Sequence, residues 1–429
     1  MPSYRYFWWL CLGFSTFPVF GQGFKPPSPS SVLQYGRNIA LILCSPEFDG
    51  RGYVNDGCSK AAKFIQEEFQ RLGLSPFKGK HAQPFYLNVN TFPNKCIVRT
   101  KGKRIEPGID YLVHPSSGDY RGILSLKKMS AAEIMQYRFG GSRSSKEAIA
   151  FVAEQKLSKD SLRMVRVKLE KIAQTDCAVI EFTREKLTWS ISDQAFNFPY
   201  LQWRDTVQQK FPKRIRCTLD AELKNQIEVA NCLGFIPSIN PSDSLIVISA
   251  HYDHLGRMGK KTYFPGANDN ASGVAMLLSL AREIMQKPLQ HHSLLFVAFA
   301  GEEIGLKGSF NLVESGLLDL DKISLVLNLD ILGSGEEGIT VVNGSVFPEY
   351  FKQLVQLNES IPAVPLIKAR GKAANSDHYP FSEKGVPSLF IYTMGPNKHY
   401  HDVFDRYENL SFDRFEALHY LFLRFLNRF

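Results

Sequence analysis

Four apolar runs of strand length, separated by helical patterns, constrain the fold of this chain more than any other feature. The runs occupy residues 245–250, 294–300, 325–329 and 389–393. Runs that are mostly apolar, rather than alternating with polar residues, are typical of strands buried on both faces of a sheet. Segment 272–286 has apolar residues every three or four positions, which predicts an amphipathic helix between two of these strands. We therefore predict an α/β fold with a mainly parallel central sheet flanked by helices.

The pattern changes between residues 86 and 226. Short β-like pieces alternate there with basic, polar stretches, and no cluster of metal-ligating residues appears. This change predicts an inserted β-rich module. The predicted organisation is a targeting segment, a first part of the main domain, the insert and the remainder of the main domain, at residues 1–21, 22–85, 86–226 and 227–429.

The N-terminus has the character of a signal peptide. Arg5 precedes a largely apolar stretch at 6–20, which has the length of a signal-peptide core and is short for a membrane span. Val19 and Gly21 are acceptable before a cleavage that would leave Gln22 first. We predict export to a periplasmic, extracellular or lumenal space, with no stable membrane insertion after cleavage. An uncleaved anchor is the alternative.

Charge and cysteine content argue against a nucleic-acid partner and against a cysteine-bound structural zinc. The chain has a formal net charge of +9, but its basic residues are not interleaved with aromatic residues, so we expect no nucleic-acid partner. Beyond the targeting segment the cysteines number six, an even count that permits up to three disulfides in an exported protein. They lack C-x-x-C spacing, which argues against a cysteine-bound structural zinc; they are Cys44, Cys58, Cys96, Cys177, Cys217 and Cys232.

Histidine and acidic residues directly follow three of the apolar runs. His251 follows the first, Glu302 and Glu303 follow the second, and Asp330 follows the third. In open α/β sheets, ligands bind beyond the carboxyl ends of the strands, so these side chains are expected at one edge. Taken singly, each could be a loop histidine, a helix cap or a solvated charge. Together they predict a metal site, because packing alone gives no reason to gather carboxylates and imidazoles.

These residues also lie in motifs that resemble the dizinc aminopeptidase and glutamate carboxypeptidase family of zinc metallopeptidases. The motifs are His251-Tyr252-Asp253, Asn268-Asp269-Asn270-Ala271-Ser272-Gly273, Glu302-Glu303-Ile304-Gly305, Asp330 and His401. The resemblance covers about residues 49–74 and 226–410. It implies a zinc-peptidase α/β fold. Family members often carry a protease-associated domain at the place where this chain changes character.

The resemblance implies two Zn²⁺ ions per chain and no organic cofactor. Asp269 would bridge the two ions. His251 and Asp330 would complete the protein ligands of one ion, and Glu303 and His401 those of the other. Three carboxylates and two imidazoles are a ligand set that suits zinc.

Three further residues have implied roles near the metals. Glu302 would act as the general base that takes a proton from a metal-activated water. Asp253 would hydrogen-bond the His251 imidazole and fix its tautomer. Tyr400, directly before His401, would steady the carbonyl oxygen of the substrate. We expect His254 to be a surface or outer-shell residue and His378 to be structural.

The function that these expectations favour is an exported, metal-dependent exopeptidase with peptide substrates, in particular an aminopeptidase that removes N-terminal residues. A carboxypeptidase or dipeptidase of the same superfamily is the first alternative. A glutaminyl-cyclase-like enzyme with a single zinc is the second, and a non-catalytic binding protein on the same fold is the third.

Overall fold

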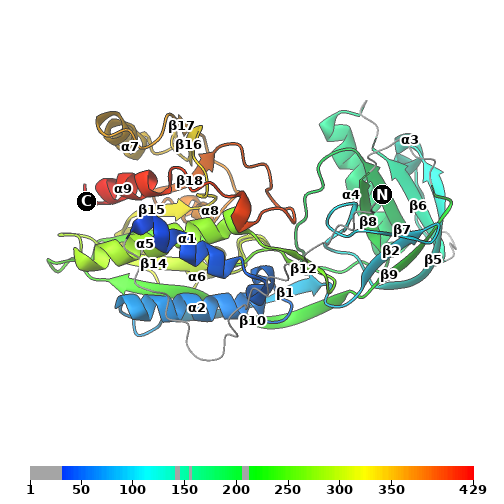
Figure 1. The fold of residues 1–429 in the computed structure, drawn as a ribbon, viewed down its shortest axis with the longest axis horizontal. Coiled ribbons are helices and arrows are strands. Elements are labelled where there is room, and N and C mark those ends of the chain that lie inside the picture. Colours follow the sequence, from blue (N-terminus) through cyan, green and yellow to red (C-terminus); the bar gives the residue numbers. More distant parts are fainter. Residues whose placement is uncertain (1–30, 141–144, 154–156, 205–211) are drawn as a thin grey trace, which may run out of the picture.

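The chain folds into two lobes, each built on its own eight-stranded sheet (Figure 1). The computed structural model describes residues 31–140, 145–153, 157–204 and 212–429. The predicted targeting segment, 1–21, therefore lies outside the described residues. Within them, no helix has both the length and the apolar character that crossing a bilayer requires.

The first lobe contains the four predicted strands at the centre of its sheet. The strands follow one another across the sheet in the order β1 (Ala82–Thr91), β10 (Glu222–Ile236), β14 (Ser293–Phe299), β11 (Leu245–His251), β15 (Ile323–Leu329), β18 (Ser388–Met394), β16 (Gly338–Val342) and β17 (Ile367–Ala369). Strands β14, β11, β15 and β18 are mutually parallel, and antiparallel pairs occur only toward the edges. The predicted α/β fold with a mainly parallel central sheet is confirmed.

Helices cover both faces of this sheet. The helices of the first lobe are α1 (Val32–Leu43), α2 (Gly57–Leu72), α5 (Ser272–Gln286), α6 (Lys307–Glu314), α7 (Pro348–Ser360), α8 (His378–Glu383) and α9 (Phe415–Leu426). Side chains of α1, α2, α5, α7 and α9 share one core with one face of the sheet, whereas α6 and α8 pack on the opposite face. Short helical turns join these elements: η1 (Pro46–Arg51), η2 (Ala267–Ala271), η3 (Leu320–Lys322) and η4 (Tyr407–Asn409).

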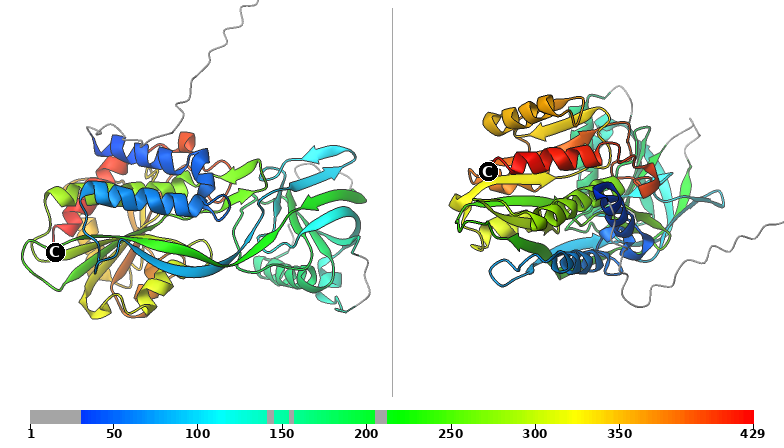
Figure 2. Two further views of the ribbon diagram at one scale, coloured as in Figure 1. Left: turned by 90° about the horizontal axis from the view of Figure 1, so that it is seen from below. Right: turned by 60° about the vertical axis from the view of Figure 1, so that its left-hand side comes forward.

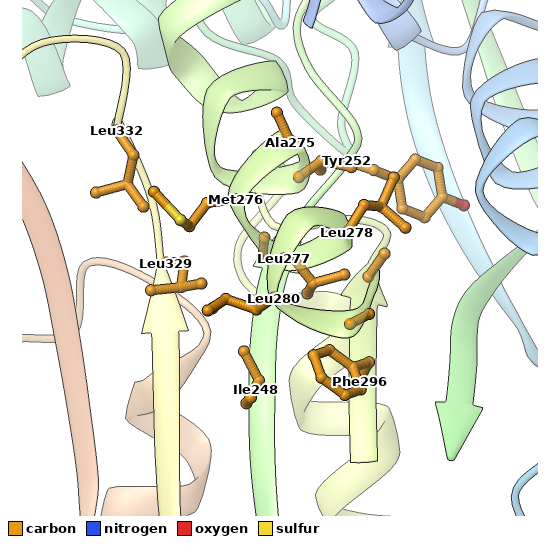
Figure 3. Packing of buried hydrophobic residues seen from close by; sticks show 14 of the residues in the cluster. Ile248, Tyr252, Ala275, Met276, Leu277, Leu278, Leu280, Phe296, Leu329 and Leu332 are labelled. Atoms are coloured by element: carbon orange, nitrogen blue, oxygen red, sulfur yellow. The ribbon is translucent and has the colours of Figure 1, made fainter. Parts of the chain in front are cut away.

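The apolar runs reflect burial on two faces. In β11, Ile246 and Ile248 face the core beneath α5, while Leu245 and Val247 face the core beneath α6 and α8. Figure 3 shows Leu277 and Leu280 of α5 lying over Ile248. Because successive side chains of a strand point to opposite faces, a strand between two cores buries both sets of side chains and is therefore mostly apolar.

Strands β1 and β10 extend from the first lobe to the second. They pair along almost their whole length, from Ala82 opposite Cys232 to Thr91 opposite Glu222, and Figure 2 shows this ribbon running between the lobes. Residues 86 and 226 lie within these two strands, so the first-lobe sheet continues beyond both of those positions. The boundaries of the insert and its protease-associated character stay predictions.

The second lobe lies at residues 96–219 and contains more helix than the sequence pattern predicted. Its sheet has the order β3 (Lys103–Ile105), β2 (Cys96–Thr100), β9 (Arg214–Leu219), β5 (Tyr120–Met129), β6 (Glu147–Val152), β7 (Ala178–Thr183), β8 (Tyr200–Arg204) and β4 (Tyr111–Val113). Helices α3 (Ala131–Met135) and α4 (Lys159–Thr175) pack on it. Helix α4 has a clear apolar face, but its many basic residues resemble a solvated polar stretch in the sequence.

A small hairpin of the first lobe, β12 (Gly256–Met258) with β13 (Thr262–Phe264), packs against the second lobe. Leu255, Met258, Phe264 and Val403 belong to the apolar core of the second sheet. The lobes therefore share buried apolar surface. The six described cysteines are all buried free thiols, so none of the permitted disulfides is present among them.

Candidate metal centre

The predicted metal ligands converge at the carboxyl edge of the first sheet. His251 is the last residue of β11, Asp330 directly follows β15, and Glu303 lies four residues beyond β14. Asp269 lies in η2, immediately before α5, and His401 lies in the loop between β18 and η4. All five side chains are largely buried.

Three of these residues form what we call the first half-site. The His251 Nε2 atom lies 3.2 Å from Asp269 Oδ1 and 3.4 Å from Asp330 Oδ1. The Asp330 Oδ1 atom is buried and has no hydrogen-bond partner among the described residues, whereas its Oδ2 atom accepts a hydrogen bond from Ser376 Oγ at 3.0 Å. The free oxygen therefore points at the group formed by His251 and Asp269.

The second half-site uses the other oxygen of Asp269. The His401 Nε2 atom lies 3.1 Å from Asp269 Oδ2 and 3.1 Å from Glu303 Oε2. The remaining Glu303 oxygen, Oε1, lies 2.6 Å from His254 Nδ1. Asp269 therefore stands between two imidazoles, with one carboxylate oxygen directed at each.

These separations fit a pair of metal ions. Two ligand atoms at 2.0–2.1 Å from one zinc ion and at tetrahedral angles lie about 3.4 Å apart. The observed nitrogen–oxygen distances of 3.1–3.4 Å match that value in both half-sites. The residues present therefore fit two ions that share Asp269.

The charges around the site also favour cations. Burial by itself lowers the pKa of His401, but Glu303 and Asp269 outweigh it and raise this pKa to about 11. Burial likewise opposes the charged form of His251, yet Asp330, Glu302 and Asp269 raise its pKa well above the usual value. Each imidazole thus lies in a strongly negative field that bound cations would neutralise.

Glu302 lies beside the first half-site and differs from its neighbour Glu303. Burial, opposed by His251, raises the pKa of Glu302 well above the ordinary value, and Glu303, Asp377 and Asp330 add to the rise. The Glu302 carboxyl therefore holds a proton more tightly than an ordinary glutamate does. One oxygen of Glu302 also lies within 4.8 Å of potential ligand atoms of His251 and Asp330, so these three residues form a group that could hold an ion.

Asp253 is arranged differently from the expectation. Its backbone carbonyl oxygen lies 3.1 Å from His251 Nδ1, whereas its carboxylate oxygen Oδ1 is 3.9 Å away from that nitrogen. The carboxylate instead accepts hydrogen bonds from the Glu302 backbone N–H at 3.1 Å and from the Tyr53 hydroxyl at 3.0 Å. The tautomer of His251 is thus set by a main-chain oxygen, and the Asp253 carboxylate orients the turn that carries Glu302.

The other histidines and Tyr400 lie at different depths. His254 is fully buried against Glu303, so the surface alternative is wrong and the outer-shell alternative stays a prediction. His378 is also buried, beside Phe390. Tyr400 is 53% exposed and stacks on the His401 ring, with the ring centroids 3.8 Å apart. Its side chain is therefore at the open side of the centre.

Two residues that support the centre were missed by reasoning from the sequence. Arg51 is fully buried and donates hydrogen bonds to five backbone carbonyls, among them those of Tyr252 and Asp269. The Asp405 carboxylate accepts from the backbone N–H groups of Asn268 and Asp269 at 2.9 and 3.0 Å. For Asp405 the only signal in the sequence is its position four residues after His401. For Arg51 the sequence offers none, since its acceptors are main-chain atoms.

Comparison with known proteins gives an independent view of this lobe. Residues 231–426 match the model of Peptidase family M28. A probable leucine aminopeptidase of Arthroderma otae is 29% identical over 202 residues, which are 44% of this chain and 54% of that protein. Aminopeptidase YwaD of Bacillus subtilis is 29% identical over 182 residues, which are 40% of this chain and 38% of that protein. The aligned part of this chain thus spans about half of these relatives or less.

Solved structures extend the likeness to both lobes. BSAP, a zinc aminopeptidase from Bacillus subtilis, superposes with a TM-score of 0.70 and 19% identity, covering 92% of this chain and 95% of that one. An aminopeptidase from Aneurinibacillus sp. strain AM-1 has a TM-score of 0.64 and 18% identity, covering 92% and 93%. Coverage of this extent must include most of the second lobe. The shared feature at this identity is the fold.

Proposed function

We propose, from the premise that residues 231–426 belong to peptidase family M28, that the protein is a metal-dependent aminopeptidase with two zinc ions per chain. The observation that carries the proposal is the position of Asp269, whose two oxygens face His251 and His401 at 3.2 and 3.1 Å. A carboxylate held between two imidazoles, each with a further carboxylate, is a bridging arrangement for two ions.

When bound, the zinc ions supply a polarised water molecule and positive charge for the scissile carbonyl oxygen. The chain itself supplies the proton transfer. Glu302 accepts a proton from the attacking water and returns it to the departing amine. The Asp253 carboxylate holds the Glu302 backbone N–H and so fixes the turn on which this base sits.

The substrate class follows from the relatives and from the site. Proteins named aminopeptidases are similar to this chain in sequence, and others named so are similar in fold. The half-exposed Tyr400 beside His401 is well placed to contact the carbonyl oxygen of a bound peptide. We assign peptides with a free N-terminus as substrates, and we assign export on the basis of the signal-like stretch 6–20.

The test compares amino-acid p-nitroanilides with a free or an acetylated amine, together with zinc content on the same preparation. We expect cleavage of the free substrates only and about two zinc ions per chain. Glu302→Gln should keep both ions and lose about 10²- to 10⁴-fold in hydrolysis, the range for a general base. Glu283→Gln, an exposed position on α5, is the matched control and should be unchanged.

Other outcomes would identify the alternatives. Cleavage confined to the C-terminus of blocked peptides would indicate a carboxypeptidase. One zinc per chain with cyclisation of N-terminal glutamine would indicate a glutaminyl-cyclase-like enzyme. Absence of both metal and hydrolysis in protein purified without chelator would indicate a binding protein.

A further inference from the structure

The second lobe reaches the metal centre through a segment shortly after β7, residues 186–193. The Trp189 backbone makes two reciprocal contacts with His401: its carbonyl oxygen lies 2.7 Å from His401 Nδ1, and its N–H donates to the His401 carbonyl at 3.0 Å. A carbonyl can only accept a hydrogen bond. His401 must therefore carry its proton on Nδ1, which leaves Nε2 free to face Asp269 and Glu303.

A second residue of this segment, Lys186, forms hydrogen bonds with the loop that carries His401. Lys186 Nζ donates to the carbonyl oxygens of Lys398 and Tyr400 at 2.6 and 2.7 Å and lies 2.9 Å from Asp402 Oδ2. These acceptors lie on both sides of His401 in the chain. His401 itself has φ 57°, a left-handed conformation that is costly for a residue with a side chain. Such a conformation persists only where surrounding contacts hold it, and Lys186 provides several of them.

The segment is in turn fixed to both lobes. Trp189 Nε1 donates to the Val113 carbonyl of β4 at 2.7 Å, and the indole stacks on Phe264 of β13 with centroids 4.5 Å apart. At its far end, Asp193 lies 3.3 Å from Lys307, the first residue of α6. The segment therefore connects the second sheet to the loop 398–402 and holds that loop in position.

We propose that segment 186–193 is a positioning element for the second half-site: it sets the tautomer and the backbone conformation of His401, so that metal affinity at this half-site depends on the second lobe. Lys186 and Trp189 are the positioning residues. The first half-site has no such dependence, because His251 is oriented by the Asp253 carbonyl of its own lobe. This inference rests on the proposed function, since it assumes that the centre binds two ions.

The experiment measures zinc binding by the metal-free full-length protein, with a chelator competition that resolves the two equivalents. Lys186→Met removes the brace, and Arg184→Met removes the same charge from an exposed position two residues away. Outer-shell substitutions typically weaken metal binding by about 10- to 100-fold. We expect Lys186→Met to weaken one equivalent by that factor and to leave the other unchanged, while Arg184→Met matches wild type and Lys186→Arg recovers most of the loss.

A double variant assigns the weakened equivalent. His401→Ala removes the second half-site directly, so adding Lys186→Met to it should have no further effect on the remaining ion. Thermal unfolding of the metal-free variants reports whether the fold is intact, and Trp189→Phe, which keeps the backbone carbonyl but loses the bond to Val113, should give a smaller loss at the same equivalent.

Two results would overturn the inference. In one, Lys186→Met binds both ions as tightly as Arg184→Met does. In the other, both equivalents weaken equally, which would indicate a general loss of stability. A wild-type protein that binds fewer than two ions would instead end the proposed function, so the two failures are distinguishable.

Discussion

In the first half-site, each contact of the His251 ring is made by the lobe that carries it: Nδ1 meets the Asp253 carbonyl and Nε2 faces Asp269 and Asp330. In the second half-site, His401 Nε2 faces Asp269 and Glu303 in a similar way, but Nδ1 meets Trp189 of the other lobe. The two halves thus have the same ligand chemistry and different support. One depends on a single sheet, and the other depends on how two lobes pack.

The difference follows from the local backbone. His251 ends a central strand whose neighbours on both sides are hydrogen-bonded, so its position is fixed by the sheet ladder. His401 lies in a loop with φ 57°, and its position is fixed by contacts from Lys186 and Trp189. A ligand at the end of a strand needs only its own sheet, whereas a ligand on a loop needs neighbours from elsewhere.

The strongest test of the comparison removes the residue that both halves share. Asp269→Asn leaves one side-chain oxygen and an amide at the shared position, so at most one half-site keeps an oxygen ligand from residue 269. We expect one tightly bound zinc instead of two, and hydrolysis reduced by more than about 100-fold, the upper range for substitutions around a metal site. Zinc content and steady-state hydrolysis measure the effect. Two retained ions would show that Asp269 does not bridge.

A second test removes hydrogen bonds that hold the backbone near both half-sites. Arg51→Met removes the arginine donor from five main-chain carbonyls, among them those of Tyr252, next to His251, and of Asp269. Each unsatisfied buried acceptor costs about 1–3 kcal/mol, so we expect the free energy of unfolding to fall by at least about 3 kcal/mol. Urea unfolding of the metal-free protein measures this.

The control for Arg51 is Arg121→Met, which breaks an exposed ion pair with Asp220 and should cost below about 1 kcal/mol. Zinc affinity provides a second readout for the Arg51 variant. Both equivalents should weaken together, because the arginine holds residues of both halves. A selective loss at one half-site would contradict this account.

A third test sharpens the comparison with one outer-shell change in each half. His254→Leu removes the contact with Glu303 Oε1, and Ser376→Ala removes the hydrogen bond to Asp330 Oδ2. Each should weaken one zinc equivalent by about 10- to 100-fold and spare the other. Zinc titration of the two variants should therefore affect opposite equivalents. If both changes affected the same equivalent, the division into two half-sites would be wrong.

The same contrast explains which features the sequence could predict. The central strands and α5 are regular and buried, so their apolar patterns locate them within one or two residues. The positions of His251 and Asp330 could be predicted as well, because they lie at the ends of two of these strands. Helix α4 was missed because the many basic residues in its sequence obscure the regular spacing of its buried apolar residues. Arg51 and Lys186 donate to main-chain oxygens of other residues, and Trp189 meets His401 Nδ1 through its own main-chain oxygen. Any residue can provide such an oxygen, so no spacing of side chains indicates these contacts.

The smallest expected effect concerns the turn beneath the base in the first half-site. Tyr53→Phe removes a hydroxyl that donates to Asp253 Oδ2 at 3.0 Å, while Asp253 Oδ1 keeps the Glu302 backbone N–H. The change should lower the free energy of unfolding by about 1–3 kcal/mol, since a buried carboxylate oxygen loses its donor. It should leave the affinity of both zinc equivalents within about threefold, because His251 is oriented by the Asp253 carbonyl and not by its carboxylate. Chemical unfolding and zinc titration of the same variant separate these effects. A loss of zinc from the first half-site would show that the carboxylate, at 3.9 Å in the structure, orients His251 after all.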